Sequence, residues 1–137
     1  MTTRAEDQQP RLPRILLAED DDSMRAFLVR AIERAGYEVV AVDRGTAALP
    51  HIVAGGFDLL LTDIVMPEMD GIELAQRAAT LAPNMRVMFI TGFAAVALAR
   101  SEGIAPGAKV LSKPFHLRDL VAEIDRAFQN PVPAAVS

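Results

Sequence analysis

Short apolar runs alternate with amphipathic segments along most of this chain, and turn residues separate them. Five apolar runs have the length of strands, and the first, third and fourth are almost continuously apolar, which is typical of parallel strands buried on both faces. The predicted strands are RILLA (14–18), YEVVAV (37–42), FDLLLTD (57–63), RVMFIT (86–91) and AKVLS (108–112). The pattern therefore predicts a strand–helix unit repeated five times.

Helices are expected between these strands. The clearest helical period lies at 117–128, where apolar residues recur three or four positions apart. Helices are also expected at about 23–35 and at about 72–81. The second and fourth helices are weaker predictions, because Pro50 falls inside the second and the fourth, AAVALARS (94–101), is short. Proline fits a helix in its first turn or at a kink, so a distorted second helix is expected.

Composition and charge indicate one globular domain. The chain has 137 residues, a net charge of −4 and scattered basic residues, which argues against nucleic acid as a partner. It contains no cysteine, no signal-peptide pattern and no apolar run of membrane-spanning length, so we expect a cytoplasmic protein without membrane contacts. A domain at 14–129 is predicted between a flexible N-terminal arm (1–13) and a flexible C-terminal tail (130–137).

Polar side chains stand at the carboxyl ends of the predicted strands. Glu19 and Asp20 follow the first strand, Asp63 ends the third, Thr91 ends the fourth and Lys113 follows the fifth. Ligands of open parallel sheets bind beyond these ends, so these side chains are expected to converge. Oxygen ligands without His or Cys suit Mg²⁺. An ionised carboxylate there would act as a nucleophile toward phosphorus, with the hydroxyl and the ammonium on the phosphoryl oxygens.

Other polar residues have simpler interpretations. Asp21 and Asp22 continue the acidic run, and either is the N-cap of the helix that follows or favours its positive end. Asp70 is interpreted as a turn or capping residue before the helix at 72–81. His51 has no second ligand at helical spacing and is interpreted as a solvated side chain.

The stretches ILLAEDDDSMR, LLLTDIVMPEMDG, FITG and LSKPF resemble the receiver domain of two-component response regulators, over about residues 14–129. The resemblance implies an α/β fold that is flavodoxin-like and doubly wound, with five parallel strands in the order 2-1-3-4-5. It also implies a stand-alone phosphorylation switch in a phosphorelay. Such a domain takes its phosphoryl group from a histidine kinase or histidine phosphotransferase, and its only activities are self-phosphorylation and self-dephosphorylation.

Position by position, the resemblance implies a role for each strand-end residue. Asp63 is the implied phosphoacceptor, Thr91 the switch hydroxyl and Lys113 the phosphoryl contact. The implied ligands of the Mg²⁺ cofactor are Asp20, Asp63, the backbone carbonyl of Val65 and, through water, Glu19.

One position departs from the receiver pattern. Many receivers carry, three residues before the lysine, an aromatic side chain that swings inward on phosphorylation, and this chain has Val110 there. The aromatic half of the usual switch is therefore in question. The positions expected to act as switch or partner contacts are Phe93, Val96, Val110, Pro114, Phe115 and His116.

A narrower resemblance concerns the output. AEDDDSMRAFL, TDIVMPEMDGIELA, FITGFAAVAL and VLSKPFHLRDLV resemble the single-domain, CpdR-like regulators of alphaproteobacteria, which implies phosphorylation-dependent protein binding as an adaptor of the ClpXP protease. An alternative is an aspartate-nucleophile phosphatase of the haloacid dehalogenase type. Those enzymes usually have a second acid two residues after the nucleophile, where this chain has Val65. A calcium-binding loop is a third reading, but EDDDSMRAFLVR lacks the central Gly and final Glu of an EF-hand.

Overall fold

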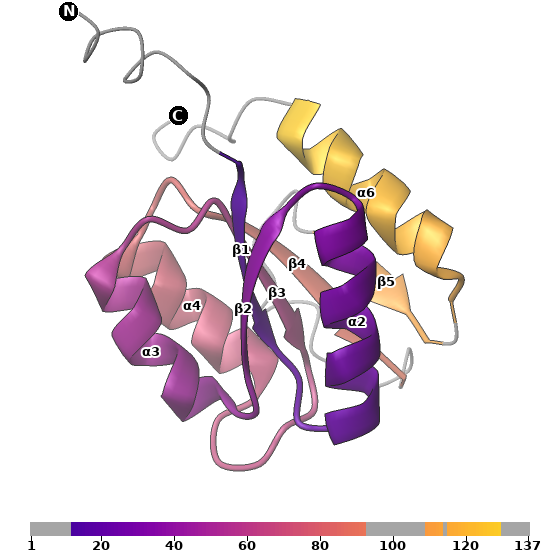
Figure 1. Ribbon diagram of the computed structural model, residues 1–137. Coiled ribbons are helices and arrows are strands. Elements are labelled where there is room, and N and C mark those ends of the chain that lie inside the picture. The colour runs from indigo at the N-terminus through magenta and orange to yellow at the C-terminus, as the bar shows by residue number, and fades with distance from the viewer. Residues whose placement is uncertain (1–11, 93–108, 114, 130–137) are drawn as a thin grey trace, which may run out of the picture.

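The computed structural model describes residues 12–92, 109–113 and 115–129, which form one parallel sheet with helices on both faces (Figure 1). The strands are β1 (Arg14–Ala18), β2 (Glu38–Val42), β3 (Leu59–Asp63), β4 (Arg86–Thr91) and β5 (Lys109–Ser112). The helices within the described residues are α2 (Asp22–Arg34), α3 (Gly45–Ala54), α4 (Gly71–Leu81) and α6 (Leu117–Gln129). The strand order is β2-β1-β3-β4-β5, which confirms the expected doubly wound topology.

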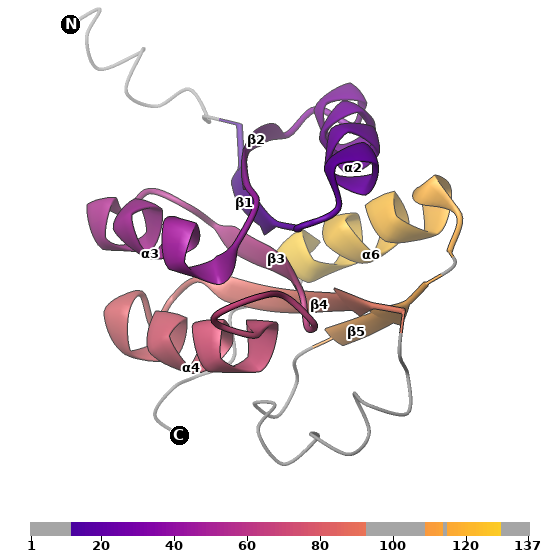
Figure 2. The same cartoon turned by 90° about the horizontal axis from the view of Figure 1, so that it is seen from below.

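The order in which successive strands join the sheet reverses at β1, with β2 on one side of it and β3 to β5 on the other. This strand pairs with β2 on one side and with β3 on the other, so that Ile15 is level with both Val39 and Leu59. Figure 2 shows the consequence: α2 and α6 cover one face of the sheet, and α3 and α4 cover the other. The carboxyl ends of β1 and β3 thus lie side by side at the switch point, where ligands bind in folds of this class.

Both faces of the sheet are buried. Successive residues of a strand point to opposite faces, so each central strand contributes side chains to two cores. The core under α2 and α6 contains Ile15, Leu17, Leu28, Ile32, Leu59, Leu61, Met88, Ile90, Leu120 and Ile124. The core under α3 and α4 contains Leu16, Ala18, Ala48, Ile52, Leu60, Met66, Met69, Leu74, Ala78 and Met85. This two-sided burial explains why the central strands are almost continuously apolar.

Two acids cap the helices that start at the carboxyl edge of the sheet. The Asp21 side chain accepts a hydrogen bond from the Met24 N–H at 2.8 Å, and Asp22 lies in the first turn of α2. The Asp70 side chain likewise accepts from the Glu73 N–H at 2.9 Å and caps α4. The structure assigns both roles that the sequence left open: Asp21 is the N-cap, and Asp22 favours the positive end of the helix.

Helix α3 runs through Pro50 without a break. Because the N-cap is Arg44, Pro50 lies in the second turn of the helix rather than in the first turn, where proline fits best. Proline has no N–H, so the Thr46 carbonyl loses its partner within the helix. Pro50 is exposed, so water can reach this part of the helix. His51, next to it, is half-buried with its ring edge-on to Phe57, rather than fully solvated.

None of the helices in the described part of the chain is long and apolar enough to cross a membrane.

Candidate functional site

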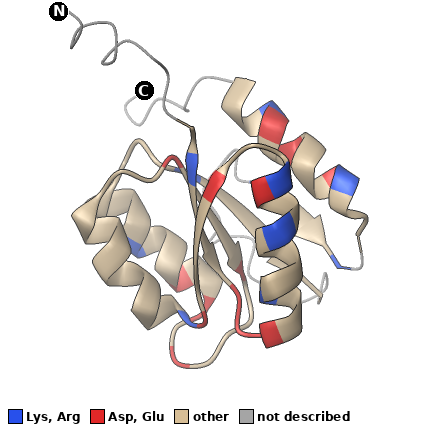
Figure 3. Ribbon diagram, in the orientation of Figure 1, with Lys and Arg blue, Asp and Glu red and all other residues tan. Residues whose placement is uncertain are grey.

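Three acids meet where β1 and β3 end. Glu19 and Asp20 follow β1 directly, and Asp63 is the last residue of β3. One carboxylate oxygen from each lies within 4.8 Å of the other two. In Figure 3 this edge of the sheet, together with the start of α2, is marked by acidic residues. Adjacent parallel strands bring these acids together although more than forty positions separate Asp63 from the other two.

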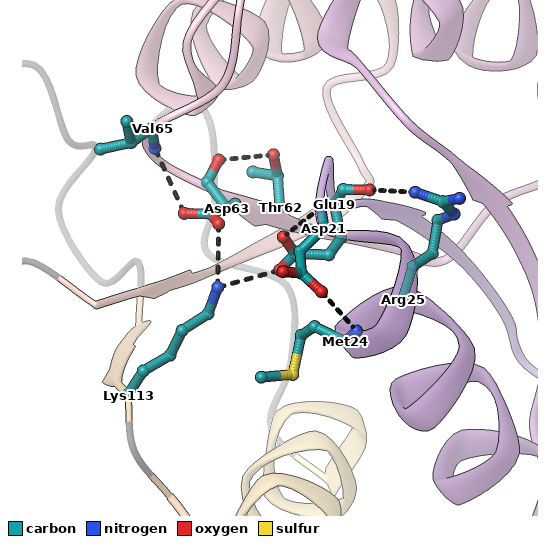
Figure 4. A network of polar contacts seen from close by, with 8 residues as sticks. All are labelled: Glu19, Asp21, Met24, Arg25, Thr62, Asp63, Val65 and Lys113. Atoms are coloured by element: carbon teal, nitrogen blue, oxygen red, sulfur yellow. Dashed lines mark hydrogen bonds and ion pairs between the residues drawn. The ribbon is translucent and has the colours of Figure 1, made fainter.

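Lys113 supplies a positive charge between two of the acids (Figure 4). Its Nζ donates to Glu19 Oε1 at 3.1 Å and to Asp63 Oδ2 at 3.0 Å. The backbone places the lysine there, because the Lys113 N–H donates to the Thr91 carbonyl at 2.7 Å, which extends the pairing of β4 with β5. The ammonium therefore offsets part of the repulsion between the two carboxylates.

Burial and charge shift the pKa values of Glu19 and Lys113. Burial raises the pKa of Glu19, whose side chain has no exposed surface, and the charge of Asp63 raises it further against the hydrogen bonds from the Asp21 N–H and Lys113. Burial alone would lower the pKa of Lys113, but its hydrogen bonds to Asp63 and Glu19 outweigh that effect and the pKa is raised. Lys113 therefore remains an ammonium ion at neutral pH.

The loop after β3 holds Asp63 in place. The Val65 N–H donates to Asp63 Oδ1 at 3.2 Å, and the Thr62 hydroxyl donates to the Asp63 carbonyl at 2.9 Å. The loop closes tightly, since the Gly71 N–H donates to the Ile64 carbonyl at 2.8 Å. As a result Asp63 is only 6% exposed, and its two carboxylate oxygens have different partners.

A pocket of about 300 Å³ opens over these residues. Its lining consists of Glu19, Asp20, Asp21, Asp63, Val65, Gly92 and Lys113. At about 30 Å³ per water molecule, the pocket has room for a hydrated cation together with a phosphoryl group. Thr91 is fully buried at the end of β4, and Gly92, the next residue along the chain, lines the pocket.

The donor set fits a hard cation. The pocket lining offers three convergent carboxylates and contains no His or Cys. Such oxygen ligands are what Mg²⁺ prefers, and a cation that keeps several of its waters needs only one or two of them directly. Asp20, Asp63 and Glu19 are thus the side chains that would hold a metal ion.

Three of the expected switch or partner positions, Phe93, Val96 and Pro114, lie outside the described residues, as does the helix expected at 94–101.

The other three positions occupy different environments. Val110 is half-buried in β5 and packs against the small core formed by Ile64, Ile72 and Phe89. Phe115 is half-buried against the core under α2 and α6. His116 is exposed, and its carbonyl accepts from the N–H groups of Asp119 and Leu120 in the first turn of α6, at 3.0 and 3.2 Å. The Val110 side chain thus packs against a buried core and is not fully exposed to solvent.

Arg25 also contacts the site and was not predicted from the sequence. Its Nη1 donates to the Glu19 carbonyl at 2.9 Å (Figure 4). Its Nη2 pairs with Asp22 Oδ1 at 2.6 Å. A signal was present in the sequence, because a cation near the N-terminus of a helix is electrostatically unfavourable and calls for specific acceptors.

Comparison with known proteins identifies the family. The sequence matches the response regulator receiver domain over residues 15–125. It is also similar to the response regulator receiver protein CpdR of Brucella abortus, with 61% identity over 115 residues, which cover 84% of this chain and 96% of that protein.

Solved structures show the same fold. A CheY-like receiver domain protein of Methanospirillum hungatei matches with a TM-score of 0.78 and 30% identity, over 87% of this chain and 95% of the other. A receiver protein of Sinorhizobium medicae matches with a TM-score of 0.80 and 29% identity, over 87% and 96%. These similarities give no support to the phosphatase alternative. With its sheet order, its acidic pocket and these matches, the chain belongs to the response regulator receiver domain family.

Proposed function

We propose that this receiver accepts a phosphoryl group on Asp63 and uses Mg²⁺ as its cofactor. The observation that carries the proposal is the convergence of Glu19, Asp20 and Asp63 with Lys113 in one pocket. Asp63 is the acid best suited to be the nucleophile, because it is buried and its two oxygens are held by Lys113 and by the Val65 N–H. These contacts orient the carboxylate before a phosphoryl donor arrives.

In the proposed transfer, an Asp63 oxygen forms a bond to phosphorus while the phosphorus–nitrogen bond of a phosphohistidine breaks. The histidine nitrogen leaves with the bonding electron pair. Lys113, already within 3.0 Å of Asp63, contacts a phosphoryl oxygen through a charge-assisted hydrogen bond. The Thr91 hydroxyl, at the end of the neighbouring strand, is the proposed contact of another phosphoryl oxygen.

The proposed Mg²⁺ ligands are the Asp20 and Asp63 carboxylates and the Val65 carbonyl, with Glu19 acting through water. When bound, Mg²⁺ would supply positive charge that neutralises the phosphoryl oxygens. Lys113 occupies part of this space by contacting both Glu19 and Asp63. The lysine therefore keeps the acids together and moves to the phosphoryl group when it arrives.

The proposed phosphodonor is a histidine kinase or histidine phosphotransferase, and the proposed output is protein binding in the cytoplasm. Phosphorylation would reorganise Thr91 and the loops around it and so shift the population of partner-binding conformers. We further propose that the unphosphorylated form acts as an adaptor of the ClpXP protease. The support is the resemblance to CpdR-like regulators, together with 61% identity to CpdR over 96% of that protein.

The phosphorylation proposal is tested with acetyl phosphate and Mg²⁺, followed by intact-protein mass spectrometry. The wild type is expected to gain one phosphoryl mass, and Asp63→Asn is expected to gain none, because an amide is a poor nucleophile. Asp119→Asn, an exposed acid of α6, is the control and should label like the wild type. Equal labelling of Asp63→Asn, or no labelling of the wild type, would rule the proposal out.

The adaptor proposal is tested by retention of purified ClpX and ClpP on immobilised receiver. The wild type and Asp63→Asn are expected to retain a protease component, and treatment of the wild type with beryllofluoride is expected to reduce this severalfold. Beryllofluoride should have little effect on Asp63→Asn, which serves as the control for a nonspecific effect of the reagent. Failure to retain any protease component in every state would contradict the adaptor role while leaving the phosphorylation proposal standing.

A further inference from the structure

Arg25 is the fourth residue of α2, and its guanidinium is turned back onto the acidic loop (Figure 4). It contacts the Glu19 carbonyl at 2.9 Å and the Asp22 carboxylate at 2.6 Å, and its side chain is only 23% exposed. The positive end of a helix is an unfavourable place for a cation. The Glu19 carbonyl on the preceding loop and the Asp22 carboxylate in the first turn of the helix offset that cost, so the arginine is tied to the loop through Glu19.

The contact matters because of the peptide that it holds. Glu19 is fixed at four points: its N–H donates to the Val42 carbonyl at 3.1 Å, its carboxylate accepts from the Asp21 N–H and from Lys113 Nζ, both at 3.1 Å, and its carbonyl accepts from Arg25. The first three contacts hold the end of β1 and the Glu19 side chain. Of these four contacts, the one from Arg25 holds the peptide plane between Glu19 and Asp20.

Asp20 depends on this peptide plane. Its carboxylate is exposed, and in the described part of the chain no hydrogen bond or ion pair restrains it, yet one of its oxygens lies within 4.8 Å of those of Glu19 and Asp63. The direction of the Asp20 side chain is therefore set by the backbone on which it stands. We propose that Arg25 is a positioning residue for the metal site, which orients the Glu19–Asp20 peptide so that Asp20 faces Asp63.

This inference rests on the proposed Mg²⁺ site and makes a prediction opposite in sign to simple electrostatics. Arg25→Gln removes a positive charge beside an acidic pocket, and Coulomb attraction alone would then tighten Mg²⁺ binding. Loss of the positioning contact weakens it instead. Outer partners that orient metal ligands typically contribute at least tenfold to affinity, so the dissociation constant of Arg25→Gln is expected to rise about 10-fold.

The test is a Mg²⁺ titration of the full chain, in which binding is measured from the backbone amide NMR shifts of residues lining the pocket. Arg30→Gln is the matched control, because it removes the same charge from the exposed face of the same helix. Its dissociation constant is expected to change less than about twofold, since exposed charges are largely screened. Arg25→Lys keeps the charge without the two-pronged guanidinium, and an intermediate loss of affinity is expected.

Hydrogen exchange in metal-free protein separates positioning from general loosening of the helix. Arg25→Gln is expected to speed exchange of the Asp21 N–H while leaving that of Ile32, buried farther along α2, unchanged. An Arg25→Gln affinity equal to or tighter than that of the wild type would overturn the inference. If that variant does not fold, wild-type affinity in Arg25→Lys would overturn it. A wild type without any response to Mg²⁺ would contradict the proposed metal site itself, and this inference with it.

Discussion

Gly71→Ala is expected to lower the free energy of unfolding by about 2–3 kcal/mol and to displace the candidate phosphoacceptor. A methyl group on Gly71 would overlap the Asp63 carbonyl oxygen and lie 2.9 Å from the Asp63 carbonyl carbon and 3.0 Å from the Ile64 Cα. These are backbone atoms, so a rotamer change cannot relieve the overlap. Intrinsic helix propensity favours Ala over Gly by about 1 kcal/mol, which is too little to compensate.

The measurement is a urea unfolding curve, with phosphoryl labelling as the second readout. Gly92→Ala is the matched control, because the same methyl group there would lie 3.7 Å from the Lys113 side chain, at an ordinary van der Waals distance. Its stability is expected to change by less than about 1 kcal/mol. If Gly71→Ala were as stable as Gly92→Ala, the loop after β3 would be more adaptable than its close packing indicates.

Lys113→Gln is expected to destabilise the metal-free protein by about 2 kcal/mol and to raise its affinity for Mg²⁺ severalfold. The substitution leaves Glu19, with no exposed surface, and the buried Asp63 without the ammonium ion that they share. The loss is below that of a fully buried pair because the lysine side chain is 21% exposed. Mg²⁺ binds more tightly in the variant since the two carboxylates no longer have a competing cation.

The pH dependence follows from the raised pKa of Lys113. Its contribution to stability is fully present below the ordinary lysine value of 10.5 and is lost only as the pH rises through the raised pKa of the folded state. The difference between wild type and Lys113→Gln should therefore be large at neutral pH. It should shrink in strong alkali, where the lysine loses its charge, and in acid, where Glu19 takes up a proton.

Lys109→Gln provides the control for this prediction. Lys109 is the first residue of β5, and Lys113 directly follows that strand. The Lys109 Nζ is 3.5 Å from Glu123 Oε1, and its side chain is 53% exposed. An exposed pair of this kind contributes about 0.5 kcal/mol or less. Thermal or urea unfolding of both variants, with and without Mg²⁺, gives the comparison. Equal small losses in the two would show that the buried contacts of Lys113 do not stabilise the fold.

Much of the fold could be predicted because local patterns of apolar and polar residues indicate where strands and helices form. Two-sided burial makes the central strands continuously apolar, and helix faces recur with a helical period, so all five strands and the helices α2, α4 and α6 lie where they were expected. Helix α3 was expected only as a weak helix around Pro50. The boundaries differ by one or two residues. For example, β3 begins at Leu59 rather than at residue 57, and the Arg14 N–H donates to the Asp58 side chain at 2.8 Å. The strand order came only from the resemblance to receivers.

The acidic run after β1 shows where local patterns stop being sufficient. The sequence by itself determined that Glu19 and Asp20 stand at a strand end and that Asp21 and Asp22 precede a helix, and from this it predicted a metal ion as the counter-charge. The structure shows that Lys113, which was expected at the same end of the sheet, contacts Glu19 from 94 positions away. It adds one cation that was not expected, Arg25 on the following helix.

Only the tertiary structure decided these contacts. A periodic pattern indicates which residues are buried and which cap a nearby helix, but it does not indicate which distant side chains are in contact. Which distant side chains meet depends on the order in which strands pair. Pairing of β1 with β3 and of β3 with β4 and β5 brings Asp63 and Lys113 to Glu19, and it is this arrangement that turns a row of acids into a site.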